Sequence, residues 1–472
     1  MALTPADLDQ ILPEGIDTDN PGKYQELIED LQGNILKGHG REYSVHLFLK
    51  FKSNTDKGKL AAKKWIQSFA QKYVTSAKKQ SDDSKNYKTQ GIPGGIFCNL
   101  LLSFSGYDYL GISYAKTPKD IFFRSGMKDP NTQAALSDPN VKKWEPDFQE
   151  NIHALILMAD DDLVDLLQEI NRMYHDLRQV AEIVHREDGF TLRNNERKTI
   201  EHFGFADGVS QPLFVKSDID KAKKKGADFN IWDPRSPLKI ILAKDPNGKK
   251  ADSYGSYLVY RKLEQNVKGF HEEQRKLAET LGVAFNLAGA MIVGRFQDGT
   301  PIVLSDKPEP NIQRTNNFTY TSDGQGSKCP FHAHTRKVNP RGDTETQSAT
   351  PVPLVDEKMH RIARRAVSYG ENDITKQPET GSGLLFLCFQ SDIQNQFNFQ
   401  QASWANQDNF VQPTIGKDPV IGQGDSPISQ KWPTGWGSHE QPVKYKFPLW
   451  VNLKGGEYFF APSISFLTTI AG

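Results

Sequence analysis

Between residues 43 and 185, apolar side chains recur at strand and helix spacing in a fixed order, which restricts the fold more than any other feature. Short apolar runs predict strands, and longer stretches with apolar residues three or four apart predict helices. Strands are expected at 43–51, 96–104, 152–158 and 179–185, and helices at 60–74 and 163–173. The order strand, helix, strand, strand, helix, strand predicts a ferredoxin-like α+β unit.

The second half of the chain repeats this plan in outline, without visible sequence repetition. Strands are expected at 256–262, 361–369 and 384–390, and helices at 272–281 and 393–404. With 472 residues, the chain is long enough for two domains. We therefore predict an α+β protein of two ferredoxin-like domains with antiparallel sheets and peripheral helices. The predicted division is an arm at 1–29, a first domain at 30–215, a connection at 216–254 and a second domain at 255–472.

The charge and cysteine content of the chain argue against several classes of partner. Lysine and arginine balance aspartate and glutamate at 58 each, so no overall field favours nucleic acid or an anionic membrane. No apolar run approaches the roughly 18 residues of a membrane span. The first residues lack the pattern of a secretory signal. Three cysteines, an odd and sparse number, favour a reducing compartment, so a cytoplasmic location is expected.

One segment, residues 329–341, concentrates side chains that can bind metals and anions. It contains Cys329-Pro330, then His332 and His334, then several arginines and a lysine. Imidazole ligands beside guanidinium groups suit an iron porphyrin, because imidazole can take an axial position and arginines can pair with two propionates. Two alternatives remain from the residues alone. The histidines could share one strand face and pack or bind a divalent metal, or Cys329 could supply a thiolate ligand.

Four motifs in this order resemble the dye-decolorising peroxidases, a family of haem enzymes. They are Gln-Gly-Asn-Ile-Leu-Lys at 32–37, Gly-Phe-Ala-Asp-Gly at 204–208, Ala-His-Thr-Arg-Lys-Val-Asn-Pro-Arg at 333–341 and His-Arg-Ile-Ala-Arg-Arg at 360–365. The resemblance extends over about residues 30–465. It implies the dimeric α+β barrel type of fold, with one haem b bound in the C-terminal half. The sequence lacks Cys-x-x-Cys-His, so the haem is expected to be held non-covalently.

The resemblance also implies catalytic roles for individual residues. His334 is expected to bind the haem iron, with its other ring nitrogen bonded to Asp418, although Asp425 is a nearby competitor. Asp207 is expected to move the peroxide proton, and Arg364 to stabilise charge as the O–O bond breaks. Since neighbouring side chains on a strand point to opposite faces, Arg365 is expected to form a surface salt bridge instead.

Further residues are expected around the haem. Leu387 and Phe389 look similar to the apolar wall that admits only small oxidants in the family. Arg336 and Arg314 are the candidates for the propionates. Because bulky dyes cannot pass such a wall, their oxidation would need a redox-active side chain at the surface. Tyr369, five residues after Arg364, is the leading candidate for this relay. The reserves are Trp404, Trp432 and Trp436.

The activity that the resemblance implies is a peroxidase that reduces hydrogen peroxide to water. Its reductants would be phenols, anthraquinone-type dyes or similar small aromatic molecules, oxidised in one-electron steps. The long loops are typical of the larger family variants, whereas the missing secretory signal departs from the secreted fungal members. A homo-oligomer is compatible with this reading. The main alternative is a haem carrier or iron-releasing protein, which would not need both Asp207 and Arg364. A shell-associated cargo role is disfavoured because no linker or docking peptide is apparent at the C-terminal end.

Overall fold

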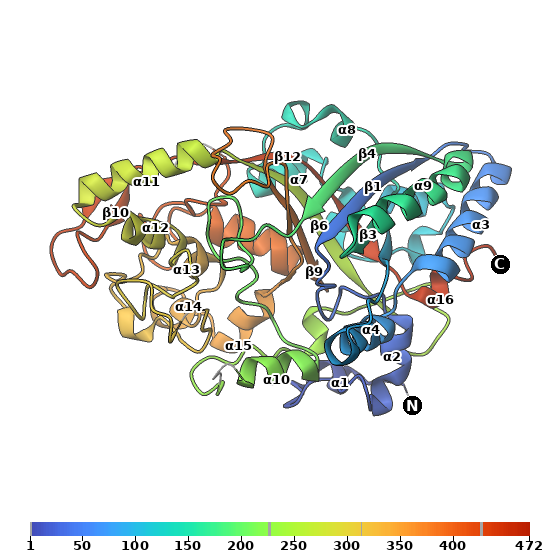
Figure 1. The fold of residues 1–472 in the computed structure, drawn as a ribbon, viewed down its shortest axis with the longest axis horizontal. Helices are drawn as coiled ribbons and strands as arrows, with labels where there is room; N and C mark the ends of the chain where they lie inside the picture. Colours follow the sequence, from blue (N-terminus) through green and yellow to red (C-terminus); the bar gives the residue numbers. More distant parts are fainter. Residues whose placement is uncertain (1, 225–227, 313, 425–427) are drawn as a thin grey trace.

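A computed structural model describes residues 2–224, 228–312, 314–424 and 428–472 of the chain. Its first half contains an antiparallel sheet in the order β4-β1-β3-β2 (Figure 1). The strands are β1 (Tyr43–Phe51), β2 (Phe97–Leu102), β3 (Ala154–Asp160) and β4 (Ala181–Phe190). This is the strand order of a ferredoxin-like unit, as the sequence predicts.

Two long helices, α3 (Asp56–Tyr73) and α9 (Leu163–Val180), pack against this sheet and against each other. The α9 helix begins where the Asp162 side chain accepts hydrogen bonds from two backbone N–H groups of the first turn. Its apolar residues recur every three to four positions and are buried: Leu166, Ile170, Met173 and Leu177. The burial of this face holds the helix on the sheet.

The second half repeats the arrangement with β6 (Tyr254–Gln265), β8 (Val367–Tyr369), β9 (Gly383–Gln390) and β12 (Val451–Ala461), in the order β8-β9-β6-β12. The helices α11 (Val267–Leu281) and α12 (Phe285–Val293) follow β6. The helix expected at 393–404 consists of two π-helical segments, Gln394–Asn398 and Gln400–Ala405. The strand expected at 361–369 is divided into β7 (Ala363–Arg364) and β8.

The two sheets join at both edges and form a closed barrel. Phe460 of β12 pairs with Leu102 of β2, and Phe190 of β4 pairs with Ser368 of β8. Inside, Phe48 of β1 meets the ring of Tyr260 from β6 at 4.9 Å in an edge-to-face contact. The predicted fold class, two ferredoxin-like units of the α+β barrel type, is therefore confirmed.

Shorter elements surround the barrel. They are α1 (Pro5–Asp9), α2 (Gln25–Asp30), α4 (Ala77–Gln90), α5 (Phe104–Tyr109), α6 (Ile121–Ser125), α7 (Pro130–Leu136), α8 (Pro146–Gln149), α10 (Lys216–Lys224), α13 (His334–Val338), α14 (Asp343–Thr346), α15 (Leu354–Glu357), α16 (Ile464–Leu467), β5 (Ala243–Lys244), β10 (Gln430–Trp432) and β11 (Val443–Tyr445). The elements α11 to α15 form the large lobe opposite α3 and α9 (Figure 1).

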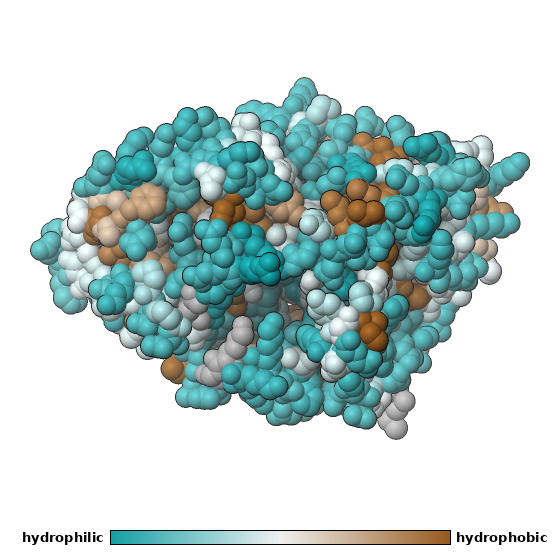
Figure 2. Space-filling view, in the orientation of Figure 1, coloured by the Kyte–Doolittle hydropathy of each residue, from teal (hydrophilic) through white to brown (hydrophobic). Residues whose placement is uncertain are grey.

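The face seen in Figure 2 is mostly hydrophilic, with hydrophobic residues in small separate groups. Among the described residues, no single helix is long and apolar enough to cross a membrane. By length and composition alone, the bent pair of α11 and α12 passes the same test, with an angle of 109° between its helices.

Candidate active site

A large cavity lies beside the C-terminal sheet, and residues from three of the sequence motifs line it. It contains about 1680 Å³ of space between atoms, part of which opens to solvent. Asp207 comes from the loop before α10, His334 from the start of α13 and Arg364 from β7. These residues are far apart in the chain, so the fold brings the three predicted side chains to one chamber.

His334 points one ring nitrogen at a buried carboxylate. Its Nδ1 lies 2.8 Å from Oδ2 of Asp418, which is fully buried. The other carboxylate oxygen of Asp418 accepts the backbone N–H groups of Val420 and Ile421 at 2.8 and 3.0 Å. Burial raises the pKa of Asp418, but His334 and these N–H donors outweigh it, so the pKa is lowered overall.

The His334–Asp418 contact leaves Nε2 of His334 for the cavity. An ionised acceptor at Nδ1 favours the proton on that nitrogen, so Nε2 carries the lone pair that can bind a metal. The competing partner Asp425 lies outside the described residues.

His332 takes a different direction from His334. It is buried against Trp432, with ring centroids 4.2 Å apart, and burial lowers its pKa to about 3. It does not line the cavity. The alternative of two histidines on one strand face is therefore wrong, because the segment forms a turn followed by the short helix α13. Cys329 is also buried away from the cavity, so it offers no thiolate there.

Asp207 is held by its backbone and leaves its carboxylate free. Gly204 and Gly208 adopt positive φ angles of 89° and 65°, which favour glycine at both turns. The N–H of Asp207 donates to the carbonyl of Thr199 at 3.3 Å. Among the described residues, no side chain or backbone group bonds to the carboxylate. Asp207 can thus accept a proton from a molecule in the cavity.

Arg364 lies on the same cavity, and its neighbour does not. One guanidinium nitrogen of Arg364 donates to the carbonyl of Ser210 at 3.0 Å. The backbone N–H of Arg364 donates to the side-chain amide oxygen of Gln211. Arg365 points the other way and donates to the carbonyls of Asn34 and Ile35 at 2.6 and 2.9 Å. The expected surface salt bridge of Arg365 is therefore wrong, since backbone oxygens take the place of a carboxylate.

The apolar wall comes from β9, but from the opposite face to the one predicted. Leu384 and Phe386 line the cavity. Leu387 and Phe389 are fully buried in the barrel and do not line it. The prediction for these two is wrong. Side chains alternate along a strand, so choosing the wrong starting residue moves the whole set to the other face.

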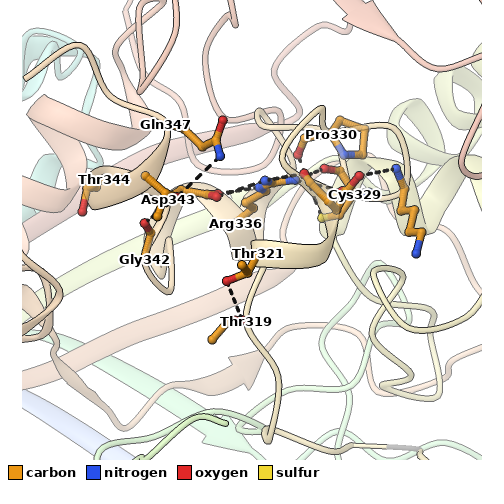
Figure 3. A network of polar contacts seen from close by, with 12 residues as sticks. Thr319, Thr321, Cys329, Pro330, Arg336, Gly342, Asp343, Thr344 and Gln347 are labelled. Carbon is orange, nitrogen blue, oxygen red and sulfur yellow. Dashed lines mark hydrogen bonds and ion pairs between the residues drawn. The ribbon is translucent and has the colours of Figure 1, made fainter. Parts of the chain in front are cut away.

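The structure also corrects the prediction for Arg336. Its side chain is fully buried and pairs with Asp323 at 3.0 Å and Asp343 at 2.6 Å. Figure 3 shows its guanidinium between Asp343 and Cys329, whose carbonyl accepts a bond at 2.5 Å. The guanidinium is thus fully occupied and lies off the cavity. Arg336 is a structural cation and not a propionate ligand.

Arg314 does not line the cavity either. One of its guanidinium nitrogens donates to the carbonyl of Thr199 at 2.9 Å. It lies near Asp207, because the same carbonyl accepts the N–H of Asp207. The geometry therefore offers no direct support for its predicted role at the propionates.

Three other arginines, Arg295, Arg341 and Arg361, do line the cavity. They are held by backbone carbonyls and amide oxygens, and none has an ion pair with a carboxylate among the described residues. Burial lowers their pKa values to about 10, 9 and 10. Buried positive charge without a partner is costly, so this cavity suits an anionic molecule such as a porphyrin with two propionates.

The sequence motifs include two of these three arginines, but they do not show which arginines face the cavity. Arg341 and Arg361 stand inside the motifs, but the motif does not say which arginine faces inward. Arg295 follows α12 and has no motif of its own.

Glu201 is another cavity residue that none of the sequence motifs contains. Its carboxylate accepts the N–H groups of Phe203 and Phe205, both at 2.9 Å, and the amide of Gln265 at 2.7 Å. Burial raises its pKa to about 7, against these donors. Glu201 therefore fastens the turn that leads into Asp207.

Tyr369 does not reach the surface. Its side chain is buried, its ring lies 4.9 Å from the ammonium of Lys262, and burial raises its pKa. Trp404 and Trp432 are buried as well, and Trp436 is half-buried with its N–H on the carbonyl of Ile302. As a residue that touches dyes directly at the surface, Tyr369 is not supported by this geometry.

Comparisons with known proteins agree with the fold and the cavity. The chain matches the family described as "DyP dimeric alpha+beta barrel domain" over residues 30–192, and the family described as "Dyp-type peroxidase, C-terminal" over residues 203–413. It is 37% identical to the multifunctional dye peroxidase DyP2 of Amycolatopsis sp., over 95% of this chain and 97% of that protein.

Solved structures give the same result. The DyP-type peroxidase AnaPX of Anabaena sp. superposes with a TM-score of 0.95 at 58% identity, covering 99% of this chain and 100% of that one. A fungal DyP-type peroxidase from Auricularia auricula-judae has a TM-score of 0.74 at 25% identity, covering 94% and 98%. DyP-type peroxidases are haem enzymes that use hydrogen peroxide and dye or aromatic substrates. The chain belongs to the dye-decolorising peroxidase family and is a peroxidase that acts on dyes.

Proposed function

We propose that the cavity binds one haem b per chain, non-covalently, and that His334 would hold its iron. Bound haem supplies the redox chemistry that takes up two oxidising equivalents from hydrogen peroxide and returns them one electron at a time. The observation that carries the proposal is that His334, backed by Asp418, lines one chamber with Asp207 and Arg364. Arg341, Arg361 and Arg295 are the proposed partners of the propionates.

Asp207 and Arg364 are the proposed catalytic pair. The Asp207 carboxylate accepts a proton from one peroxide oxygen and delivers it to the other, which leaves as water. Arg364 stabilises the negative charge that develops as the O–O bond breaks. Leu384 and Phe386 limit the space beside these groups, so that peroxide enters and bulky aromatic molecules do not. Two molecules of a phenol or an anthraquinone-type dye then each give up one electron.

A haem carrier or iron-releasing protein is the less favoured alternative. Such a protein needs His334 and the arginines of the cavity. It has no use for a free carboxylate and a guanidinium at Asp207 and Arg364. The presence of both groups in the chamber supports the peroxidase.

Further proposals concern the setting of the protein. A cytoplasmic location is supported by Cys98, Cys329 and Cys388, which are all free and buried. The oligomeric state and the identity of the natural reductant can both be measured directly. We propose neither a nucleic-acid nor a membrane partner, in keeping with the zero net charge.

The test is a stopped-flow experiment. The haem-loaded ferric protein is mixed with one equivalent of hydrogen peroxide, and the Soret band is followed. A fast spectral shift that a reducing dye reverses supports the proposal. A spectrum that only bleaches or stays unchanged contradicts the peroxide step and favours the carrier.

A further inference from the structure

Lys337, three residues after His334, has a fully buried side chain, and among the described residues its ammonium has only carbonyl oxygens, and no carboxylate, within bonding distance. Its ammonium donates to the carbonyl oxygens of Gln407 and Gly416, both at 2.7 Å. The carbonyl of Ala405 lies at 3.5 Å. Burying a lysine without a counter-charge is costly, so its presence calls for a reason.

The three carbonyls belong to the segment that carries Asp418. The N–H of Asp418 donates to the Ala405 carbonyl at 2.8 Å, which is also the most distant of the oxygens around the ammonium. Gly416 stands two residues before Asp418. Lys337 therefore joins the helix α13, which holds His334, to the backbone that places Asp418 against it.

Burial lowers the pKa of Lys337 to about 7, so below that pH its ammonium adds a positive charge to this buried region. Asp418 and Asp408 are the acidic groups that act on Lys337, and Lys417 opposes them. The charges of Lys337 and Asp418 also act on the nearby ring of His332. In a low-dielectric interior, a nearby cation weakens the electron donation that an aspartate passes to a ligating imidazole.

We propose that Lys337 is a positioning residue for the proximal side of the cavity. It holds the Asp418 segment in register with His334, and its charge limits how basic the imidazole becomes. The proposal rests on the proposed binding of haem iron by His334. Its consequence is that Lys337 raises the reduction potential of the ferric/ferrous couple.

Two substitutions separate the tether from the charge. Lys337→Gln keeps N–H donors but removes the charge, whereas Lys337→Met removes both. We expect Lys337→Gln, measured below pH 7, to shift the midpoint potential of the loaded protein to more negative values, because the ferric state gains when a nearby cation is lost and when the imidazole donates more strongly. In Lys337→Met the loosened contact between Asp418 and His334 opposes this shift, so its potential should lie above that of Lys337→Gln. Lys337→Met should in addition change the iron–imidazole stretching frequency in the Raman spectrum.

Lys262→Met is the matched control. Lys262 is also a buried lysine, but its ammonium pairs with Glu145 and Glu187 at 2.9 and 2.5 Å. This variant should lose stability and keep the potential of the wild type. If Lys337→Gln keeps the wild-type potential and loses only stability, Lys337 is merely structural and the proposal is overturned. An equal shift in Lys262→Met overturns it too.

A measurement without haem keeps this inference distinct from the proposed function. Nitrogen-15 NMR of the histidine side chains in the haem-free chain reports which nitrogen of His334 carries the proton. Wild type and Lys337→Gln should show the proton on Nδ1, and Lys337→Met should show a mixture of the two forms. A wild-type signal in Lys337→Met contradicts the tether, whether or not haem binds as proposed.

Discussion

The Nδ1 atom of His334 lies 2.8 Å from Oδ2 of Asp418, and His334 lines the same cavity as Asp207 and Arg364. A buried carboxylate in this position sets the orientation and the proton of the imidazole. Backbone bonds hold both segments: the N–H of Asp418 donates to the carbonyl of Ala405 at 2.8 Å, and the N–H groups of Arg336 and Lys337 donate to the carbonyl of Ala333 at 3.0 Å.

Asp418→Asn should weaken this pair without removing it. The neutral amide holds the ring less firmly and makes it a poorer electron donor, so we expect activity to fall by about 10- to 100-fold. The midpoint potential should move to more positive values, opposite to the shift expected for Lys337→Gln. Spectroelectrochemical titration measures it, and an unchanged potential would show that Asp418 does not act on the iron through His334.

Asp207→Asn should leave haem binding intact and slow the reaction with peroxide. Loss of a general base costs about 100- to 10,000-fold in rate. The second-order rate constant from stopped flow is the measurement, with the wild-type Soret band as evidence that the pocket is preserved. A variant that reacts with peroxide as fast as the wild type removes Asp207 from the mechanism.

Phe386→Ala and Phe389→Ala form a matched pair on one strand. Phe386 faces the cavity, so its loss should let larger aromatic reductants approach and raise their kcat/KM. Phe389 is packed inside the barrel, so its loss should cost about 3–5 kcal/mol of unfolding free energy. Steady-state kinetics with a bulky dye and denaturant unfolding compare the two. If Phe389→Ala raised kcat/KM for the dye and Phe386→Ala only lost stability, Phe389 would face the cavity, as the sequence predicted.

Arg341→Leu should affect haem binding, whereas Arg336→Leu should affect the stability of the fold. Removing Arg341 should speed haem release by about tenfold or more, a loss of about 1.4 kcal/mol of affinity. Removing Arg336 leaves two buried carboxylates unpaired and should cost about 3–5 kcal/mol of stability in the haem-free chain. Haem transfer to apomyoglobin measures the first effect and thermal unfolding the second. Faster haem release in a stable Arg336→Leu protein would contradict the assignment.

Glu201→Gln should flatten the pH dependence of stability. Burial raises the pKa of Glu201 from 4.5 to about 7, so the folded state favours the protonated form. The wild type should therefore lose stability as pH rises from about 4.5 to about 7, by about 1.4 kcal/mol for each pKa unit of difference. Denaturant unfolding of the haem-free chain across this range tests it. Parallel curves for variant and wild type would mean that Glu201 keeps an ordinary pKa.

Several features of the protein could be predicted from its sequence because they depend on local pattern. Apolar spacing was enough for the α+β class and the repeated ferredoxin-like plan. The resemblance of the motifs to those of the dye-decolorising peroxidases was enough to select His334, Asp207 and Arg364, which the fold then brings to one cavity. In these cases, the chemical type of a residue and its nearest neighbours carry the information.

Tertiary structure alone decided which face and which partner each remaining side chain has. Phe386 and Leu387 are adjacent and both apolar, and only the pairing of β9 with β6 determines which one faces the cavity. Arg336 and Arg341 lie in one motif, but Asp323 and Asp343 neutralise the first, whereas the second has no carboxylate partner among the described residues and lines the cavity. The partners of a buried charge come from distant segments, so its role follows from the folded chain and not from its local sequence.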